Sequence, residues 1–494
     1  MSKKEKKKSK KIRPQLLRGF RDYPPSEQIA REKMLATVRH SYEMMGFLPF
    51  RTTTVEAAEI LLGAHYTEDS LAELFGFTGP EETDMSLRYE FTLSLARYVA
   101  GNPDLPLPFR GYQYGSVFRV DKPGPGRYRE FMQCDIDIVG TSNLLADAEI
   151  IATMVETLKA LGISRFRVRF SNRKILNGLI EHAGIPPERG PEVMRVIDKL
   201  EKQGRAAVIE ELGAGRVDQS GDKIPGLHLE SDHVARVEEF LDIAEETVGE
   251  QASDAGPLAR VERLLGSYSP AREGIDELRQ IQEHLESLQV DRDKHGIDLT
   301  IVRGLGYYTG PVFETVLLDL PDFGSVFSGG RYDNLVDRFL NRSIPAVGSS
   351  IGLDRLMAAL IELDAVRLES ATAKVIVTTM DRERLPDYLK MAREIRQAGI
   401  PAEVYAGDTK NLTKQIKYAD KIGIPIAVIA GSKEFEQGEV TVKNLEMGRL
   451  KAARTEDREE WLRAEEIQQT IDRSRMILHI QEQLAAIERE IRGR

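Results

Sequence analysis

The sequence predicts a mixed α/β protein of several domains, one of which contains an antiparallel sheet. Its 494 residues are too many for one ordinary hydrophobic core, so we expect two to four domains. Two strand-like segments are joined by the turn-forming residues 121–126, DKPGPG, which predicts an antiparallel pair. From residue 374 onward strand and helix patterns alternate, which predicts a parallel sheet with helical crossovers.

The composition is that of a globular protein in a reducing, cytoplasmic compartment. Hydrophobic residues make up 41% and charged residues 30%, which is not the balance of a disordered chain. No run reaches the ~18 apolar residues that a membrane helix needs, so a membrane-spanning protein is excluded. We interpret the single cysteine, Cys134, as a small buried residue. The histidines lack metal-binding spacing, so we expect no metal site built by the protein alone. A net charge of −10 argues only against a uniformly basic surface.

Helix and strand patterns mix in the first third of the chain. A helix is expected from Glu27 to Met45, because apolar residues recur there at helical spacing after Pro24 and Pro25. Gly46 and Phe47 end this helix. The strands expected next are Phe50 to Val55, Gln113 to Val120 and Arg129 to Val139.

Charged helical patterns predominate in residues 174–297, and we expect a mostly helical insertion there. Strand patterns then resume, and a helix follows from about Gly352 to Leu363. The strands expected between them are Leu299 to Arg303, Val312 to Leu318 and Gly324 to Phe327.

A linker, Asp364 to Ala373, leads to the C-terminal α/β region. Gly438 to Asn444 is expected to add a strand at the edge of its sheet, and one or two exposed helices are expected after Thr455. The β-α-β-α-β elements before them are Lys374 to Thr378, Leu385 to Ala398, Ala402 to Tyr405, Asn411 to Lys421 and Ile424 to Ile429. An apolar stripe near the end would pack against the body of the protein or against a partner; it consists of Met476, Ile477, Ile480, Leu484 and Ile487.

The first thirteen residues, MSKKEKKKSKKIR, are dominated by lysine. No apolar stretch follows them, so they are neither a secretory signal nor an amphipathic transit peptide. Two interpretations remain open. The segment is a disordered, solubilising tail, or it is a basic arm that contacts RNA phosphates.

The sequence contains neither of two common nucleotide-binding loops, the phosphate loop and the dinucleotide loop. The pattern GxxxxGK[ST] of the phosphate loop is absent. The segment GLGYYTG, residues 304–310, superficially suggests a dinucleotide loop. Its glycine spacing is one residue too long, and it leads into a strand rather than a helix.

Arginines next to glycines or turns are the remaining chemical signal. Arg119 ends a strand before the 121–126 turn, and Arg127 and Arg129 follow that turn. Arg303 precedes a glycine-rich turn, and Arg355 begins an apolar helix. Taken singly, each would be a surface ion pair. Together they predict planar donors for a polyphosphate, which guanidinium groups bind with fork geometry.

Several segments resemble the motifs of class II aminoacyl-tRNA synthetases. FRVDKPGPGRYREFMQCDIDIVG, residues 118–140, resembles their motif 2, and VGSSIGLDRL, residues 347–356, resembles their motif 3. RGLGYYTGPVFE, residues 303–314, and SGGRYD, residues 328–333, resemble two signatures peculiar to histidyl-tRNA synthetases.

Two further segments extend this resemblance from about Arg18 to Leu450. LRYEFTLSLARYVA, residues 87–100, resembles the segment that binds the amino group of the substrate in that family. KYADKIGIPIAVI, residues 417–429, resembles its C-terminal anticodon-binding domain.

The resemblance implies an antiparallel class II synthetase sheet flanked by helices, a helical insertion and a C-terminal α/β anticodon-binding domain. The expected boundaries are a basic tail at 1–13, a first catalytic part at 14–173, the insertion at 174–297, a second catalytic part at 298–365, the anticodon-binding domain at 373–452 and a helical extension at 453–494.

The resemblance also implies the reaction and its partners. L-histidine would be activated with ATP, accompanied by Mg²⁺, to histidyl-adenylate and pyrophosphate. Histidine would then pass to the 3′ end of tRNA-His. We expect a homodimer, as is usual in this family.

The site residues carried over from the family fall into three groups. Catalysis would rest on Arg303, on the far side of the α-phosphate, and on Arg119, which would hold the α-phosphate. ATP would be bound by Arg119, Asp121, Arg127 and Arg355, the last of these at the γ-phosphate. Histidine would be bound by Glu90 and Thr92 at its ammonium with Gln133 nearby, and by Asp137, Tyr308 and Tyr332 at its imidazole.

Three residues depart from the family pattern. Gly306 stands where the family usually has an acidic residue, and Thr53 where motif 1 usually has proline. Glu90 stands where the branch of the family that has aspartate at the position of Asp137 more often has aspartate. Two alternatives share the fold: a synthetase-like regulatory subunit of histidine biosynthesis and an inactive tRNA-sensing domain. The first lacks the anticodon domain and the second usually loses the arginines, so the sequence favours the enzyme.

Overall fold

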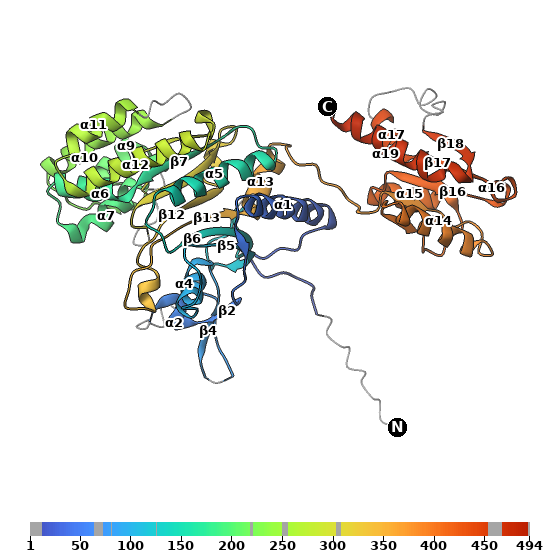
Figure 1. Ribbon diagram of the computed structural model, residues 1–494, viewed down its shortest axis with the longest axis horizontal. Helices are drawn as coiled ribbons and strands as arrows, with labels where there is room; N and C mark the ends of the chain where they lie inside the picture. Colours follow the sequence, from blue (N-terminus) through green and yellow to red (C-terminus); the bar gives the residue numbers. More distant parts are fainter. Residues whose placement is uncertain are drawn as a thin grey trace. The chain divides into compact units, whose positions relative to one another are not determined.

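The chain folds into two compact units (Figure 1). The first unit comprises residues 1–21 and 34–366, and the second comprises residues 22–33 and 367–494. This computed structural model describes residues 12–63, 73–80, 82–124, 126–217, 221–248, 255–302, 308–452 and 467–492.

An eight-stranded sheet forms the centre of the first unit, in the order β1-β5-β6-β13-β12-β11-β7-β10. The six inner strands are antiparallel, whereas the short edge strands β1 and β10 run parallel to β5 and β7. The bounds in sheet order are β1 Leu48–Pro49, β5 Phe109–Phe118, β6 Glu130–Val139, β13 Ala346–Gly352, β12 Phe327–Arg331, β11 Pro311–Leu317, β7 Phe166–Asn172 and β10 His295–Ile297.

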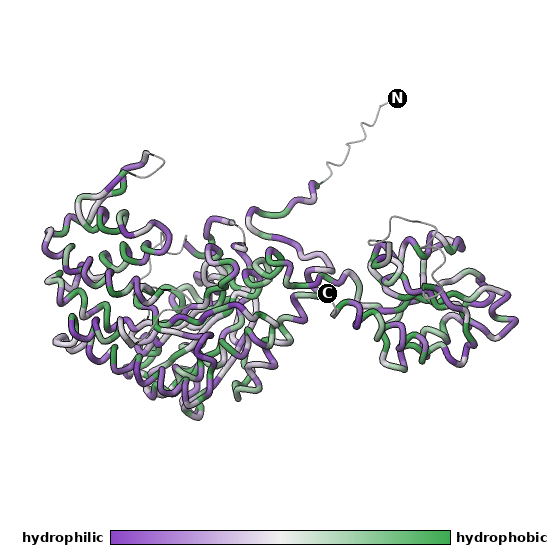
Figure 2. The backbone as a smooth tube through the Cα atoms, turned by 90° about the horizontal axis from the view of Figure 1, so that it is seen from above, coloured by the Kyte–Doolittle hydropathy of each residue, from purple (hydrophilic) through white to green (hydrophobic). Residues whose placement is uncertain are grey.

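Helices cover one face of this sheet. Helices α5 (Leu145–Ala160) and α13 (Leu353–Glu362) pack against β6 and β13. Ser349 of β13 contacts the sulfur of Met154 on α5 at 3.3 Å. Because side chains alternate along a strand, the neighbours of Ser349 on β13 point to the opposite face. Figure 2, coloured by hydropathy, shows green apolar stretches in the interior of the first unit. The first long helix, α1 (Pro25–Met44), buries apolar residues such as Val38.

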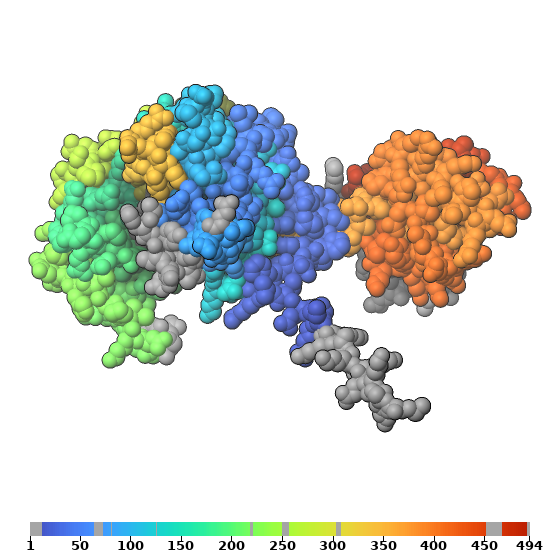
Figure 3. Space-filling view, turned by 90° about the horizontal axis from the view of Figure 1, so that it is seen from below, coloured from blue at the N-terminus to red at the C-terminus, as the bar shows by residue number. Residues whose placement is uncertain are grey.

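A smaller antiparallel sheet, in the order β2-β4-β3, lies in the N-terminal part of the first unit. The short 3-10 helix η5 (Val336–Arg338) packs against α4, and Figure 3 shows the gold segment around η5 beside blue N-terminal residues. The elements of this part are β2 Val55–Ala57, α2 Ala58–Leu62, β3 Gly76–Thr78, β4 Asp84–Leu87 and α4 Thr92–Ala100.

Helices dominate the described residues between β7 and β10. Apolar side chains at helical spacing, among them Val208, Phe240 and Val261, are fully buried there. The elements are α6 Arg173–His182, α7 Gly190–Ile197, α8 Leu200–Gln203, α9 Arg205–Leu212, β8 Gly215–Val217, β9 Lys223–Pro225, α10 Ser231–Ala244, α11 Ala255–Leu265 and α12 Ser269–Ser287. Short 3-10 helices lie at Pro187–Arg189 (η1), Glu245–Thr247 (η2), Arg292–Lys294 (η3) and, after β11, Pro321–Phe323 (η4).

A five-stranded sheet, in the order β15-β14-β16-β17-β18, forms the centre of the second unit. Its first three strands are parallel and its last two antiparallel. The elements are β14 Val375–Val377, α14 Leu385–Gln397, β15 Ala402–Val404, α15 Leu412–Ile422, β16 Ile426–Ile429, α16 Ser432–Gln437, β17 Glu439–Asn444, α17 Leu445–Ala452, β18 Gln468–Asp472, η6 Arg473–Arg475 and α19 Met476–Arg492.

The end of the chain differs from its prediction. Residues 438–444 were expected at the edge of the sheet, which is wrong, because the unpredicted strand β18 pairs along the outer side of β17. The apolar stripe of α19 packs against the body of the second unit. Met476 and Ile480 are fully buried there, in the same core as Val375 and Tyr388. Residues 453–466 lie outside the described part of the chain.

Strand predictions in the first unit succeed where the strand is long. Strands β5, β6 and β11 occupy the predicted segments with shifted ends. The strand predicted at 50–55 is wrong over most of its length, because its β-branched threonines do not enter a ladder. The Arg88 guanidinium binds the carbonyl oxygens of Thr52 and Thr53 instead, both at 3.3 Å.

The strands predicted at 299–303 and 324–327 are also misplaced. Residues 299–302 form no strand, and residue 303 lies outside the described part. The sheet is instead extended by β10, which the sequence interpretation had included in the helical insertion. Strand β12 begins only at Phe327. No helix among the described residues combines the length and apolar character needed to cross a membrane.

Candidate active site

Polar side chains occupy the helix-free face of β6, because the strand alternates in sequence. Gln133, Asp135 and Asp137 are spaced two residues apart and therefore point to the same side of the sheet. Cys134 and Ile136 point to the opposite side. All five are buried. A buried row of carboxylates and an amide is costly unless donors satisfy it, so this face indicates a binding site.

A row of glycines runs across the sheet beside Asp137. Asp137 lies opposite Gly348 of β13, which lies opposite Gly330 of β12. A Cβ atom at Gly348 would lie 1.9 Å from Asp137 Oδ1, and one at Gly330 would lie 2.8 Å from Cδ1 of Tyr308. The glycines therefore let the carboxylate and the tyrosine ring lie directly over the sheet. The Tyr332 hydroxyl donates a hydrogen bond of 2.5 Å to Asp137 Oδ1, so the structure brings these three predicted residues together.

Burial raises the pKa values of the carboxyl groups in this part of the site. It is the main cause that raises the pKa of Asp137 to about 7, against the hydrogen bond from Tyr332. Burial, followed by the charge of Asp137, also raises the pKa of Asp135 well above its usual range. Asp137 Oδ2 and Gln133 Oε1 are buried and accept no hydrogen bond from any described residue. A cation with N–H donors would satisfy both atoms and stabilise the ionised carboxylates.

Glu90 is fixed at the start of α4. Its two carboxylate oxygens accept hydrogen bonds from the backbone N–H groups of Thr92 and Leu93, both at 2.7 Å. Burial raises the pKa of Glu90, while these bonds act in the opposite direction. The negative charge of Glu90 in turn contributes to the raised pKa of Asp137. Glu90 therefore lies near Asp137, and Thr92 lies beside Glu90 at the start of α4.

Arginines line a cavity of about 280 Å³ on the same face. The predicted residues Arg119, Asp121, Arg127 and Arg355 all line it, together with Gln133. Arg119 Nε donates to the backbone carbonyl of Tyr89 at 3.1 Å. We call this space the phosphate cavity, because fork-shaped donors on several sides suit a polyphosphate.

The predicted hairpin loop contributes Asp121, Lys122 and Gly126 to the lining of the phosphate cavity. Gly126 adopts φ +63, and a Cβ atom there would lie 3.1 Å from the ring of Phe323 and 3.7 Å from the Cα atom of Arg355. The Arg355 guanidinium donates to the carbonyl of Phe323 and lies over its ring. Glycine at 126 thus allows the loop to approach α13 closely. Pro125 lies outside the described residues.

Sequence reasoning missed two polar residues of this face. Asp135 lies between Gln133 and Asp137, and Ser350 lies directly opposite Asp135 on β13. The period-two pattern of QCDID would have identified Asp135, whereas Ser350 depends on the register between two distant strands. Arg303 and Gly306 lie outside the part of the chain that the structure describes.

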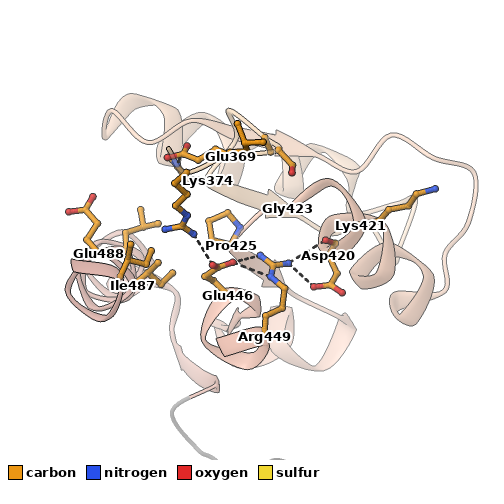
Figure 4. Close-up of a pocket in the computed structure, with 16 residues that line it drawn as sticks. Glu369, Lys374, Asp420, Lys421, Gly423, Pro425, Glu446, Arg449, Ile487 and Glu488 are labelled. Atoms are coloured by element: carbon orange, nitrogen blue, oxygen red, sulfur yellow. Dashed lines mark hydrogen bonds and ion pairs between the residues drawn. The ribbon is translucent and has the colours of Figure 1, made fainter. Parts of the chain in front are cut away.

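A larger cavity, of about 440 Å³, lies within the second unit (Figure 4). Figure 4 shows Arg449 between Asp420 and Glu446, at 2.6 Å and 2.5 Å from their carboxylates. Arg367 also pairs with Glu446 at 2.9 Å. Because these charges neutralise one another, this cavity offers a polyphosphate less than the smaller phosphate cavity does.

Family models account for both units. The model described as histidyl-tRNA synthetase matches residues 19–356, and the model described as anticodon binding domain matches residues 373–465. An antiparallel sheet with an arginine-lined cavity, followed by such a domain, defines an aminoacyl-tRNA synthetase.

Individual relatives narrow this class. A histidine–tRNA ligase of Paracoccus denitrificans is 40% identical over 97% of this chain and 99% of its own length. One from a Ruegeria species is 43% identical over 92% and 93%. The crystal structure of a Nostoc histidyl-tRNA synthetase is 31% identical, with a TM-score of 0.78 over 96% of this chain and 100% of its own. The chain belongs to the histidyl-tRNA synthetase family, and its activity is that of a histidine–tRNA ligase that uses ATP.

Proposed function

We propose that the polar face of the first unit holds histidine and ATP end to end for adenylate formation. Gln133 carries this proposal, because it lies on the same strand face as Asp137 and also lines the phosphate cavity. A histidine whose imidazole lies at Asp137 would then direct its carboxylate towards the arginines. Holding two reactants in this way lowers the barrier mainly by removing the entropy cost of bringing them together.

Asp137, Tyr308 and Tyr332 would recognise the imidazole ring. A ring N–H needs an acceptor, and Asp137 Oδ2 has no other hydrogen-bond donor among the described residues. Burial keeps the pKa of Tyr308 above its ordinary value, so its hydroxyl stays protonated and can donate to the other ring nitrogen. Glu90, Thr92 and Gln133 would receive the ammonium group.

Arg119 would hold the α-phosphate, Arg355 the γ-phosphate, and Arg127 and Asp121 the remaining ATP contacts. Arg303 would act on the far side of the α-phosphate, a role that rests on the family motif alone. Fixed donors around the α-phosphate stabilise the charge that grows as pyrophosphate leaves. No group of three or more candidate ligands for a metal occurs among the described residues. Mg²⁺ would enter with ATP, held largely by phosphate and water oxygens.

The second unit would read the anticodon of tRNA-His, and the enzyme would act as a homodimer in the cytoplasm. Apolar side chains are exposed near the edge strand β1: Met44 at 73%, Leu48 at 60% and Tyr114 at 38%. A second copy would cover them. Leu48→Glu should shift the mass measured by sedimentation towards the monomer, whereas the exposed Leu478→Glu on α19 should not.

Amino-acid-dependent ATP–pyrophosphate exchange tests the site. Wild-type protein should exchange with histidine alone among the twenty amino acids. Asp137→Asn should raise the KM for histidine and leave the KM for ATP nearly unchanged. Equal loss of both would place Asp137 outside the histidine pocket.

A further inference from the structure

Three polar side chains connect β6 to β13 within the proposed histidine pocket. Gln133 Nε2 donates to Ser350 Oγ at 3.0 Å, and Ser350 Oγ donates to Asp135 Oδ1. Asp135 and Ser350 lie directly opposite each other in the sheet, and Gln133 lies one step along β6 on the same face. We call this chain of hydrogen bonds the amide relay.

The direction of the amide relay follows from its chemistry. When Asp135 is ionised it can only accept hydrogen bonds, so the single hydroxyl proton of Ser350 then points to Asp135, as in the structure. Ser350 then has only lone pairs to offer Gln133, and these bind the NH₂ side of the amide. Gln133 Oε1 is therefore turned away from the relay, where it is buried and accepts no hydrogen bond from a described residue.

We propose that Asp135 and Ser350 are positioning residues that fix the Gln133 amide with its oxygen towards the substrate, so that this end of the pocket accepts an ammonium group. This inference rests on the proposed histidine site and adds two residues to it. Without the relay the amide could rotate by half a turn and present N–H donors to a cation. Both groups would then be left unsatisfied in a buried place.

Electrostatics supports the same direction once a substrate is bound. Burial and the nearby Asp137 raise the pKa of Asp135, which favours its neutral form in the empty pocket. A cationic ammonium group nearby favours the ionised form, which is the form that orients the relay. The orientation of Gln133 and the arrival of the ammonium therefore reinforce each other.

The test compares L-histidine with imidazolepropionate, which carries the ring and the carboxylate but no ammonium. Binding of each is measured by calorimetry in the absence of ATP. Ser350→Ala and Asp135→Asn should each weaken L-histidine binding by about 10- to 100-fold, the usual effect of one unsatisfied buried group. Affinity for imidazolepropionate should change less than about threefold on the same scale.

Two further variants separate positioning from damage to the fold. Ser349→Ala alters the neighbouring serine, which faces Met154 on the other side of the sheet, and should leave both affinities unchanged. Gln133→Glu combined with Asp135→Asn keeps the total charge and replaces the amide by a group that accepts at both oxygens. This double variant should recover most of the affinity for L-histidine.

The outcomes separate the relay from the site itself. Wild-type protein that binds imidazolepropionate as tightly as L-histidine would overturn the ammonium site and the relay with it. Wild-type protein that prefers L-histidine, with a Ser350→Ala variant of the same preference, would overturn the relay alone. Equal weakening of both ligands in Ser350→Ala would also overturn it, because the residue would then be structural.

Discussion

The phosphate cavity of the first unit and the larger cavity of the second unit differ in how the charges of their arginines are satisfied. In the second unit Arg449 is held by two carboxylates, and Arg367 shares one of them. In the phosphate cavity neither Arg119 nor Arg127 forms an ion pair with any described residue, although both line the space. We infer from this difference that the paired arginines of the second unit belong to the scaffold, and that Arg119 and Arg127 remain available to an anionic ligand.

The largest loss of activity should follow a substitution in the phosphate cavity. Arg119→Ala should lower the rate of adenylate formation by about 10²–10³, by analogy with loss of one donor to a developing anion. Single-turnover kinetics with saturating histidine and ATP would measure it. Arg119→Lys keeps the charge but loses the fork, and should recover only part of the rate. A near-normal rate in Arg119→Ala would remove the contrast between the cavities.

A smaller effect is expected at the ring of the substrate. Tyr308→Phe should weaken use of histidine by about 1–3 kcal/mol, because a buried polar group of the substrate loses its partner. The KM for ATP should stay within about twofold on the same scale. Exchange kinetics with each substrate varied in turn would show this. If the KM for ATP rises instead, Tyr308 belongs to the phosphate cavity.

The raised pKa of Asp137 predicts how the free energy of unfolding depends on pH. The pKa of Asp137 is raised to about 7, so the empty folded protein binds a proton there more tightly than the unfolded chain does. Its contribution to the free energy of unfolding therefore falls as pH rises from about 4 to about 7. Asp137→Asn removes this loss, and should be more stable relative to wild type at pH 8 than at pH 5 by on the order of 1–3 kcal/mol. Denaturant titrations at the two pH values, without ligands, would test the sign.

A substitution in the larger cavity of the second unit should have the smallest effect on activity. Arg449→Ala breaks two ion pairs that are partly exposed, and pairs of this kind contribute about 0–1 kcal/mol. We expect a slightly lower unfolding midpoint for the second unit and histidine-dependent exchange within about twofold of wild type. A large loss of exchange would show that this cavity takes part in activation after all.

Much of the fold could be predicted from local patterns, but the site could be predicted only in part. Alternating side chains and the turn between them predict strands β5 and β6. The β-α-β order of residues 374–429 can likewise be predicted from short sequence patterns. Strand β10 has three residues and exists because β7 lies beside it, which no local pattern reveals. Strand β18 is likewise defined by its pairing with β17.

The same distinction separates the residues of the site. Arginines beside glycines, such as Arg119 and Arg355, stand out in a short window of sequence. Ser350 becomes meaningful only when β13 is placed against β6, more than 200 residues earlier in the chain. The glycine at 348 has the same origin, because its small size is required by Asp137 rather than by its own strand.

The packing of α19 has a consequence for the order in which the protein can fold during synthesis. The first unit has its last strand and helix once residue 366 has been made, whereas the core of the second unit still lacks Met476 and Ile480. Until β18 has been made, the outer edge of β17 is unpaired, and such an edge is a template for pairing with other chains. We expect nascent chains halted near residue 450 to be captured by chaperones or to aggregate through this edge, while their first unit is already native. Protease resistance of ribosome-bound chains of increasing length would reveal the two stages.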